Sequence, residues 1–163
     1  MRVFTLTKEQ RIERPVNEVF AFFERPENLA TITPPELGFR ILTPTPIEMK
    51  PGTLIDYSVR ILGVRTHWRT LICDYQPPHR FVDSQLKGPY TFWHHTHTFE
   101  EVDGGTIIRD EVRYVLPFGW LGRLMNRLVV RRQLRGIFEF RARVIGDHFA
   151  GAERAKPDRP VSA

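Results

Sequence analysis

The sequence predicts an α+β fold in which an antiparallel sheet packs against a long C-terminal helix. Three observations support this prediction. Apolar and polar residues alternate with a period of two over 37–116, in segments that short turns separate. Two short helical patterns precede this region, and one long helical pattern follows it. Because parallel strands need connections of about a dozen residues or more, the short turns indicate an antiparallel meander.

The N-terminal region predicts one strand followed by two short helices. Residues 2–12 alternate in the manner of a strand. Pro15 then stands where the first turn of a helix tolerates proline, and the apolar residues after it recur at helical spacing. A second helix is expected at 27–31. It should end before Pro34 and Pro35, because the residue before a proline avoids the helical conformation.

The middle region divides into six predicted strands, and its turns determine how these strands pair. The strands are 37–42, 53–61, 64–74, 79–86, 90–101 and 106–116. Turn residues lie at Leu62-Gly63, Lys87-Gly88-Pro89 and Asp103-Gly104. Counting outward from these turns predicts cross-strand pairs, which include Tyr57 with Trp68, Asp83 with Trp93, and His97 with Asp110.

All three pairings turn the same set of side chains toward the interior. This set mixes aromatic residues with Asp, Gln and His, and burying such polar groups costs several kcal/mol unless each finds a partner. A ligand cavity with a few convergent polar groups accounts for the mixture. Its entrance is expected between 117–122 and the turns near Gly63 and Gly88. The predicted ligand-binding residues are Tyr57, Val59, Trp68, Thr70, Asp83, Gln85, Trp93, His95, His97, Asp110, Val112, Tyr114 and Trp120.

The C-terminal region predicts one helix of about 30 residues, from Trp120 to Phe149. Gly136 and the arginines at 131–132 interrupt its apolar stripe, so the helix is expected to bend or to contact the sheet unevenly. Residues 151–163 lack periodicity and apolar bulk, and we predict a flexible tail there. Residues 1–150 then form a single domain.

Composition and charge narrow the class of protein. The 163 residues are 41% apolar and 26% charged, as expected for one globular domain. The single Cys73 cannot form an internal disulfide, and residues 1–10 lack the apolar run of a signal peptide, so we expect a cytoplasmic protein. The net charge of +5 comes largely from arginines on the last helix. These arginines are expected to form a solvated face of the helix, and a transient contact with a membrane is the alternative. We expect no nucleic-acid partner.

Several segments together resemble the SRPBCC superfamily, which is also described as START-like or polyketide cyclase/dehydrase-like, and within it the small bacterial ligand-binding proteins. The resemblance covers about residues 3–149. It depends on PVNEVF (15–20), PPHRFVDSQLKGPYTFWHHTHTFE (77–100), GGTIIRDEVRY (104–114) and PFGWLG (117–122). The resemblance implies a helix-grip fold with the order β-α-α-β6-α, in which a curved sheet wraps around the C-terminal helix and leaves a cavity beneath it. The superfamily contains lipid carriers, hormone receptors, cyclases and dehydratases, so the resemblance alone does not fix a function.

The pair His97 and Asp110 has three interpretations, which the sequence leaves open. The two side chains could form a buried structural contact, orient a ligand, or transfer a proton. His95 and His97 with Asp83 or Asp110 would also be acceptable zinc or iron ligands. Nothing else in the sequence requires a metal, so we expect no metal and no other cofactor.

Two functions are compatible with these patterns. The favoured one is the binding or carriage of a hydrophobic small molecule, such as a lipid, an isoprenoid, a quinone or a polyketide-like compound. The alternative is a cyclase- or dehydratase-like enzyme in which His97, with Asp110, moves a proton. An imidazole nitrogen open to the cavity would favour the enzyme, and a closed His97-Asp110 contact would favour the carrier.

Overall fold

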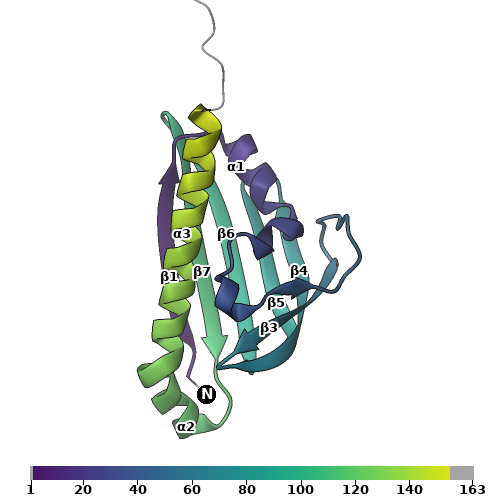
Figure 1. Ribbon diagram of the computed structural model, residues 1–163, viewed down its shortest axis with the longest axis vertical. Coiled ribbons are helices and arrows are strands. Elements are labelled where there is room, and N and C mark those ends of the chain that lie inside the picture. The colour runs from purple at the N-terminus through teal and green to yellow at the C-terminus, as the bar shows by residue number, and fades with distance from the viewer. Residues whose placement is uncertain (1, 155–163) are drawn as a thin grey trace, which may run out of the picture.

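A computed structural model describes residues 2–154 and shows one seven-stranded antiparallel sheet with the strand order β1-β7-β6-β5-β4-β3-β2. The long helix α3 runs along the sheet, as Figure 1 shows. The elements in chain order are β1 (Phe4–Ile12), α1 (Val16–Phe23), η1 (Pro26–Ala30), η2 (Pro35–Leu37), β2 (Arg40–Ile41), β3 (Leu54–Ile61), β4 (Val64–Gln76), β5 (Arg80–Lys87), β6 (Phe92–Val102), β7 (Gly105–Val115), α2 (Gly119–Met125), η3 (Asn126–Val130) and α3 (Arg131–Arg154).

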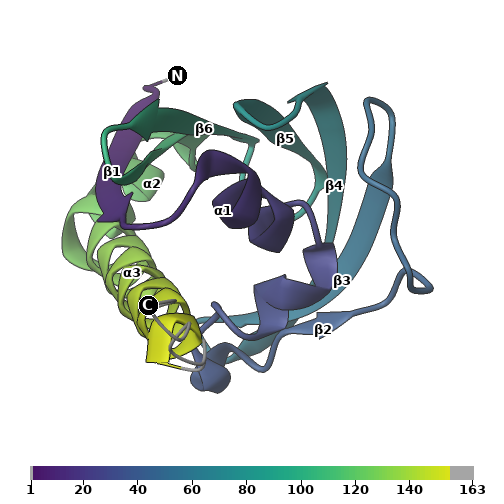
Figure 2. The ribbon, with the colours of Figure 1, turned by 90° about the horizontal axis from the view of Figure 1, so that it is seen from above.

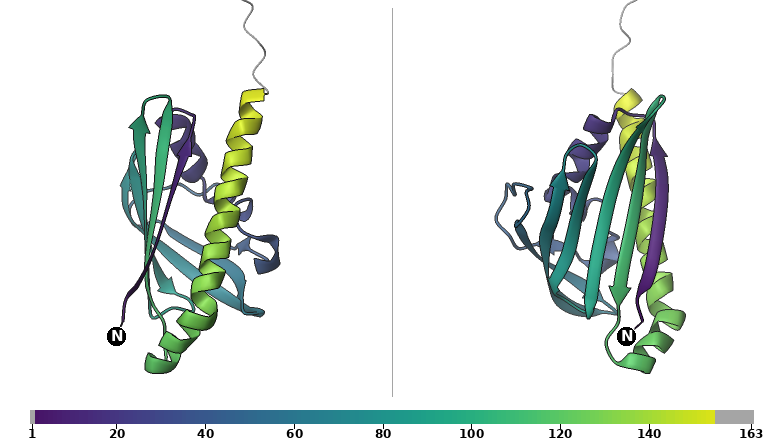
Figure 3. Two further views of the ribbon diagram at one scale, coloured as in Figure 1. Left: turned by 90° about the vertical axis from the view of Figure 1, so that its left-hand side faces the viewer. Right: turned by 180° about the vertical axis from the view of Figure 1, so that it is seen from behind.

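The sheet is strongly curved, and the helices close its concave side. Figure 2 shows the strands bending around α1, with α3 along the open side of the curve. The two views of Figure 3 show the same arrangement from the side and from behind, with α2 at one end of the molecule. The predicted helix-grip order of one strand, two short helices, six strands and a long helix is therefore confirmed. In the described part of the chain, no helix is long and apolar enough to cross a membrane.

Two of the three predicted strand pairings are confirmed. Tyr57 lies opposite Trp68 in β3 and β4, and His97 lies opposite Asp110 in β6 and β7. The predicted faces are also confirmed, since Trp68 is buried and the adjacent Arg69 is exposed. Tight turns explain this success, because a two-residue connection fixes the register of both strands that it joins.

The pairing of β5 with β6 was predicted wrongly by two residues. Asp83 lies opposite His95, not opposite Trp93. The connection is longer than predicted because β6 begins only at Phe92, and the Gln85 side chain binds within it by donating to the Tyr90 carbonyl at 2.7 Å. A shift of two residues keeps every side chain on its predicted face, since side chains alternate with a period of two. It does change the neighbours of Asp83.

Three predicted boundaries also differ from the structure. The strand expected at 37–42 is only Arg40–Ile41, because Leu37 ends η2 and Gly38 adopts the left-handed conformation at φ 52°. The long C-terminal helix is interrupted by the π-helical η3, directly before the arginines where a bend was expected. Helix α3 then continues to Arg154, so 151–154 are helical and not part of a tail, while the remainder of the predicted tail lies outside the described residues.

Apolar clusters attach the helices to the sheet at both ends of the concave face. Phe20 of α1 packs edge-on against Phe81 and Phe99 of the sheet, with ring centroids 6.1 and 5.2 Å apart. Leu134 and Phe138 of α3 pack against residues of β7. The interior between these two clusters is bounded by the sheet, η1 and the middle of α3, and this is where the candidate site lies.

Candidate functional site

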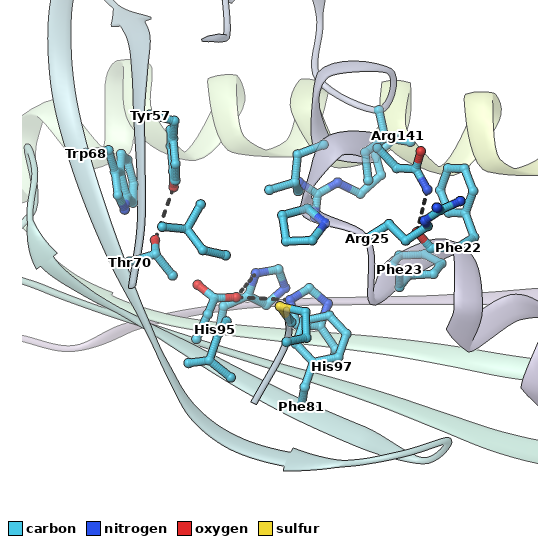
Figure 4. Close-up of a pocket in the computed structure, with 18 of the residues that line it drawn as sticks. Phe22, Phe23, Arg25, Tyr57, Trp68, Thr70, Phe81, His95, His97 and Arg141 are labelled. Carbon is cyan, nitrogen blue, oxygen red and sulfur yellow. Dashed lines mark hydrogen bonds and ion pairs between the residues drawn. The ribbon is translucent and has the colours of Figure 1, made fainter. Parts of the chain in front are cut away.

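The interior holds two adjoining chambers. The first is a cavity of about 130 Å³ lined by Phe22, Phe23, Arg25, Pro26, Asn28, Leu29, Ile32, Met49, Ile55, Tyr57, Trp68, Thr70, Ile72, Phe81, Asp83, Trp93, His95, His97 and Arg141. The second is a cavity of about 110 Å³ lined by Leu29, Thr33, Leu37, Phe39, Tyr57, Val59, Ile61, Trp68, Tyr90, Trp93, His95, Gln133, Leu134, Ile137, Phe138 and Arg141. Figure 4 shows the lining of the first chamber, with the imidazoles of His95 and His97 on the sheet side and Arg141 on the helix side.

Aromatic side chains from β3, β4 and β6 form the boundary between the chambers. Tyr57 stacks on Trp68 with centroids 5.8 Å apart and an angle of 17° between the rings. Trp68 in turn meets Trp93 edge-on at 5.3 Å. Burial raises the pKa of Tyr57, so its hydroxyl stays neutral, and it lies 3.4 Å from the Thr70 hydroxyl. Such flat walls bind apolar or planar molecules through burial and stacking.

Two carboxylates and two imidazoles form a closed ring on the sheet side of the first chamber. Asp110 Oδ1 lies 2.9 Å from His95 Nε2 and 2.8 Å from His97 Nδ1. Asp83 Oδ2 lies 3.1 Å from His97 Nε2 and 3.6 Å from His95 Nδ1. Only the His95-Asp110 and His97-Asp83 contacts have the alignment of hydrogen bonds. Every ring nitrogen of the two histidines therefore faces a carboxylate oxygen.

Burial and the opposite charges in this ring act against each other. Burial raises the pKa of Asp110, but the contacts with His95 and His97 outweigh it and hold this pKa far below its usual value of 3.8. Burial lowers the pKa of His97, but Asp110 and Asp83 outweigh it and raise that pKa above 6.5. The pKa of His95 is lowered, by burial and then by the charge of His97. His97 is therefore the first of the two imidazoles to gain a proton.

Arg141 of α3 is the cationic side chain that lines both chambers. Its Nε is fully buried and has no hydrogen-bond partner, and no described carboxylate forms an ion pair with its guanidinium. The guanidinium carbon lies 4.9 Å from the centre of the Phe138 ring. Burial raises the pKa of Asp83, but the hydrogen bond from His97 and the charges of the two histidines outweigh it, and the charge of Arg141 adds the smallest lowering effect. A buried donor without an acceptor is costly, so this guanidinium is suited to donate hydrogen bonds to an anionic or carbonyl oxygen of a ligand.

Among the described residues, one group of three side chains has atoms close enough together to hold a metal ion. One nitrogen or oxygen atom from each of Asp83, His95 and His97 lies within 4.8 Å of the others. Asp110 contacts the two imidazoles in addition, so each imidazole nitrogen already lies between 2.8 and 3.6 Å from a carboxylate oxygen.

Most of the predicted ligand-binding residues come together at the cavity, and five do not. Tyr57, Trp68, Thr70, Asp83, Trp93, His95 and His97 line the first chamber, and Val59 lines the second. The residues that line neither chamber are Gln85, Asp110, Val112, Tyr114 and Trp120.

Each of these five side chains has a local reason for lying elsewhere. Gln85 binds the Tyr90 carbonyl, and Asp110 lies behind the two imidazoles. Val112 is fully buried in the cluster beneath α3. The Tyr114 hydroxyl donates to Asn126 Oδ1 at 2.7 Å, and Trp120 on α2 is 69% exposed.

Sequence reasoning missed the helical side of the cavity. Arg141 was grouped with the solvated arginines, although it lies three residues after Phe138 and four before Ile145, both of which are buried. This spacing places Arg141 on the buried stripe of the helix, and it is the signal that could have identified the residue. Leu29 and Met49 were missed because they belong to η1 and a loop, where no periodicity marks an inward face.

Comparisons with known proteins agree with this architecture. The family described as polyketide cyclase / dehydrase and lipid transport matches residues 12–138. No curated protein matches the chain.

Three solved structures illustrate the range of similar proteins. An aromatase/cyclase from Streptomyces sp. R1128 has 16% identity and a TM-score of 0.72 over 94% of this chain and 98% of its own. A protein from Thermus thermophilus has 15% identity and a TM-score of 0.72 over 91% of this chain and 98% of its own. A major latex-like protein from Panax ginseng has 12% identity and a TM-score of 0.66 over 90% of this chain and 97% of its own. At these identities the likeness shows a shared fold.

Proposed function

Because the chain belongs to the polyketide cyclase / dehydrase and lipid transport family, we propose that it binds a hydrophobic small molecule in the two chambers and carries it unchanged. A lipid, an isoprenoid, a quinone or a polyketide-like compound would suit the apolar and aromatic lining. The observation that carries the proposal is the closed ring of Asp83, His95, His97 and Asp110. Its imidazole nitrogens all face carboxylates, so none is directed at a bound molecule.

The ligand of this proposal has an acidic or strongly polar oxygen. Arg141 supports this assignment, because its Nε is buried without a hydrogen-bond partner, whereas Arg25, the other arginine that lines the first chamber, is exposed. An oxygen bound there would lie between the aromatic boundary of the chambers and α3. The remaining apolar body of the ligand would then extend along Tyr57, Trp68 and Trp93.

The alternative is a cyclase- or dehydratase-like reaction in which His97, with Asp110, moves a proton. One observation favours it, namely that Asp83, His95 and His97 line the first chamber and are not sealed from it. Such a reaction requires one imidazole nitrogen to leave its carboxylate when the substrate binds. Arg141 would then stabilise negative charge that develops on a substrate oxygen.

The proposal is tested by calorimetric titration with decanoate and with 1-decanol, which share an apolar chain and differ in charge. The native protein is expected to bind both and to prefer decanoate. Arg141→Gln should weaken decanoate binding by about ten- to a hundredfold, because a charge-assisted hydrogen bond contributes about 1.5–3 kcal/mol. Decanol binding should change little.

Arg143→Gln is the matched control, since Arg143 is an exposed arginine two residues further along the same helix. It should retain the preference for decanoate. If neither compound binds, the carrier proposal is wrong. If both bind equally and Arg141→Gln has no effect, the cavity binds apolar molecules but Arg141 does not select an acidic one.

A further inference from the structure

The end of the molecule formed by α2 and η3 exposes an unusual set of apolar side chains. We define the apolar tip as Phe118, Trp120, Leu121, Leu124 and Leu128, which are 79%, 69%, 45%, 44% and 61% exposed. These five residues lie within eleven positions of one another, and they face solvent in the described structure. Clustered exposed aromatic and leucine side chains mark interaction surfaces.

Within 118–138 every charged side chain is an arginine, and one exposed carboxylate from elsewhere in the chain, Glu36, shares a groove with Leu128 and Arg132. We define the arginine flank as Arg123, Arg127, Arg131 and Arg132, all of which are exposed. No acidic residue occurs between Glu111 and Glu139 in the sequence. No residue of the flank forms an ion pair with a described carboxylate. An apolar helix face bordered by arginines is typical of helices that lie in the interface of an anionic bilayer.

A groove beside this surface adjoins the second chamber. It runs between the β3-β4 turn and the start of α3, where Leu62 faces Leu128 and Arg132. Leu37, Gln133 and Ile137 line both this groove and the second chamber. An entrance was expected between 117–122 and the turns near Gly63 and Gly88. The groove includes Leu62, next to Gly63, but no residue of 117–122 and no residue near Gly88. Figure 1 shows α2 beyond the ends of the strands, so this end can contact a flat surface without interference from the sheet.

We propose that the apolar tip and the arginine flank dock the protein on an anionic lipid bilayer, with the groove directed toward the lipid. The charge distribution favours this partner over a second copy of the chain. A two-fold dimer through the same patch would place the two arginine flanks against each other, and like charges repel. A polyanion such as nucleic acid would neutralise the arginines but would leave the tip exposed to water.

The test is co-sedimentation with vesicles of phosphatidylcholine, with and without phosphatidylglycerol. The native protein should sediment with the phosphatidylglycerol vesicles and should be released by high salt, because screening weakens surface electrostatics. The double variant Arg123→Gln and Arg127→Gln should reduce the partition coefficient roughly fivefold for each arginine. The double variant Trp120→Ala and Leu124→Ala should also lose binding, because it removes apolar side chains that enter the interface.

The matched control is Arg60→Gln with Arg113→Gln, which removes two exposed arginines from the outer face of the sheet. This control should bind vesicles like the native protein, and all variants should keep the native melting temperature because the replaced side chains are exposed. Equal loss of binding in the control would show nonspecific attraction and would overturn the proposal. Absence of vesicle binding, or a dimer in solution that Trp120→Ala dissociates, would overturn it as well.

Discussion

Replacing Asp110 with Asn is expected to lower the free energy of unfolding by about 3–5 kcal/mol, the usual cost of removing one partner from a buried ion pair. Asp110 is 7% exposed and contacts both His95 and His97 through one oxygen. Asparagine keeps the shape but removes the charge, so His97 retains only Asp83 as a counter-charge. Urea denaturation of the native and variant proteins measures the difference.

The effect of this substitution should depend on pH. Because the folded-state pKa of Asp110 lies below 3.8, its stabilising contribution is present above that pH and is lost as the pH falls toward the folded pKa. The difference between native and variant proteins should therefore shrink in acid. His97 has a raised pKa, so its contribution is present below 6.5 and is lost as the pH rises through the folded pKa.

The exposed neighbour Glu111 provides the control for the Asp110 substitution. Glu111→Gln makes the same chemical change on the outer face of the same strand. It should shift the free energy of unfolding by no more than about 0.5 kcal/mol. An equal effect of the two substitutions would show that the ring of histidines and carboxylates contributes no special stability.

Replacing Thr70 with Phe is expected to abolish the binding of apolar ligands while the protein remains folded. Thr70 is 5% exposed and lines the first chamber, and its hydroxyl makes a long contact of 3.4 Å with the Tyr57 hydroxyl. The larger ring would occupy the space that a ligand needs. Overpacking should cost about 1–3 kcal/mol of stability, which a folded domain of this size tolerates. Decanoate titration and thermal unfolding measure the two effects separately.

The structure changes which residue is best suited to such a test. Val112, which the sequence placed at the cavity, is fully buried in the cluster beneath α3, so a larger side chain there would strain the core without filling a chamber. Thr98→Phe is the control for Thr70→Phe, because Thr98 lies on the outer face of β6. This control should leave ligand binding intact. Continued tight binding by Thr70→Phe would contradict the location of the site in the first chamber.

Tight turns mark the part of the sheet that could be predicted from the sequence. The contact between His97 and Asp110 was predictable, because the Asp103-Gly104 turn fixes the register of β6 against β7. The complete ring was not, because it requires Asp83 to lie opposite His95. That neighbour depends on the length of the β5-β6 connection, which a glycine and a proline do not specify as tightly as a two-residue turn.

The helical side of the site was the least predictable part. The π-helical η3 inserts an irregular turn between α2 and α3, so the face of the helix cannot be followed from Trp120 to Phe149 with one period. Trp120 consequently lies outside the cavity. Arg141 lies beyond η3, where its spacing from Phe138 and Ile145 within α3 still marks the buried face. A register error of two residues leaves the faces of a strand unchanged, whereas the face of a helix is lost when its period changes once.

The central claim is that the two chambers hold a hydrophobic molecule with an acidic or polar oxygen. The most direct test is native mass spectrometry of the protein purified from its host. The expected result is a population with additional mass that denaturation releases as an apolar compound carrying such an oxygen. Arg141→Gln should reduce this population, and Thr70→Phe should remove it. A native protein that carries no added mass, and that gains none on incubation with decanoate, would contradict the claim.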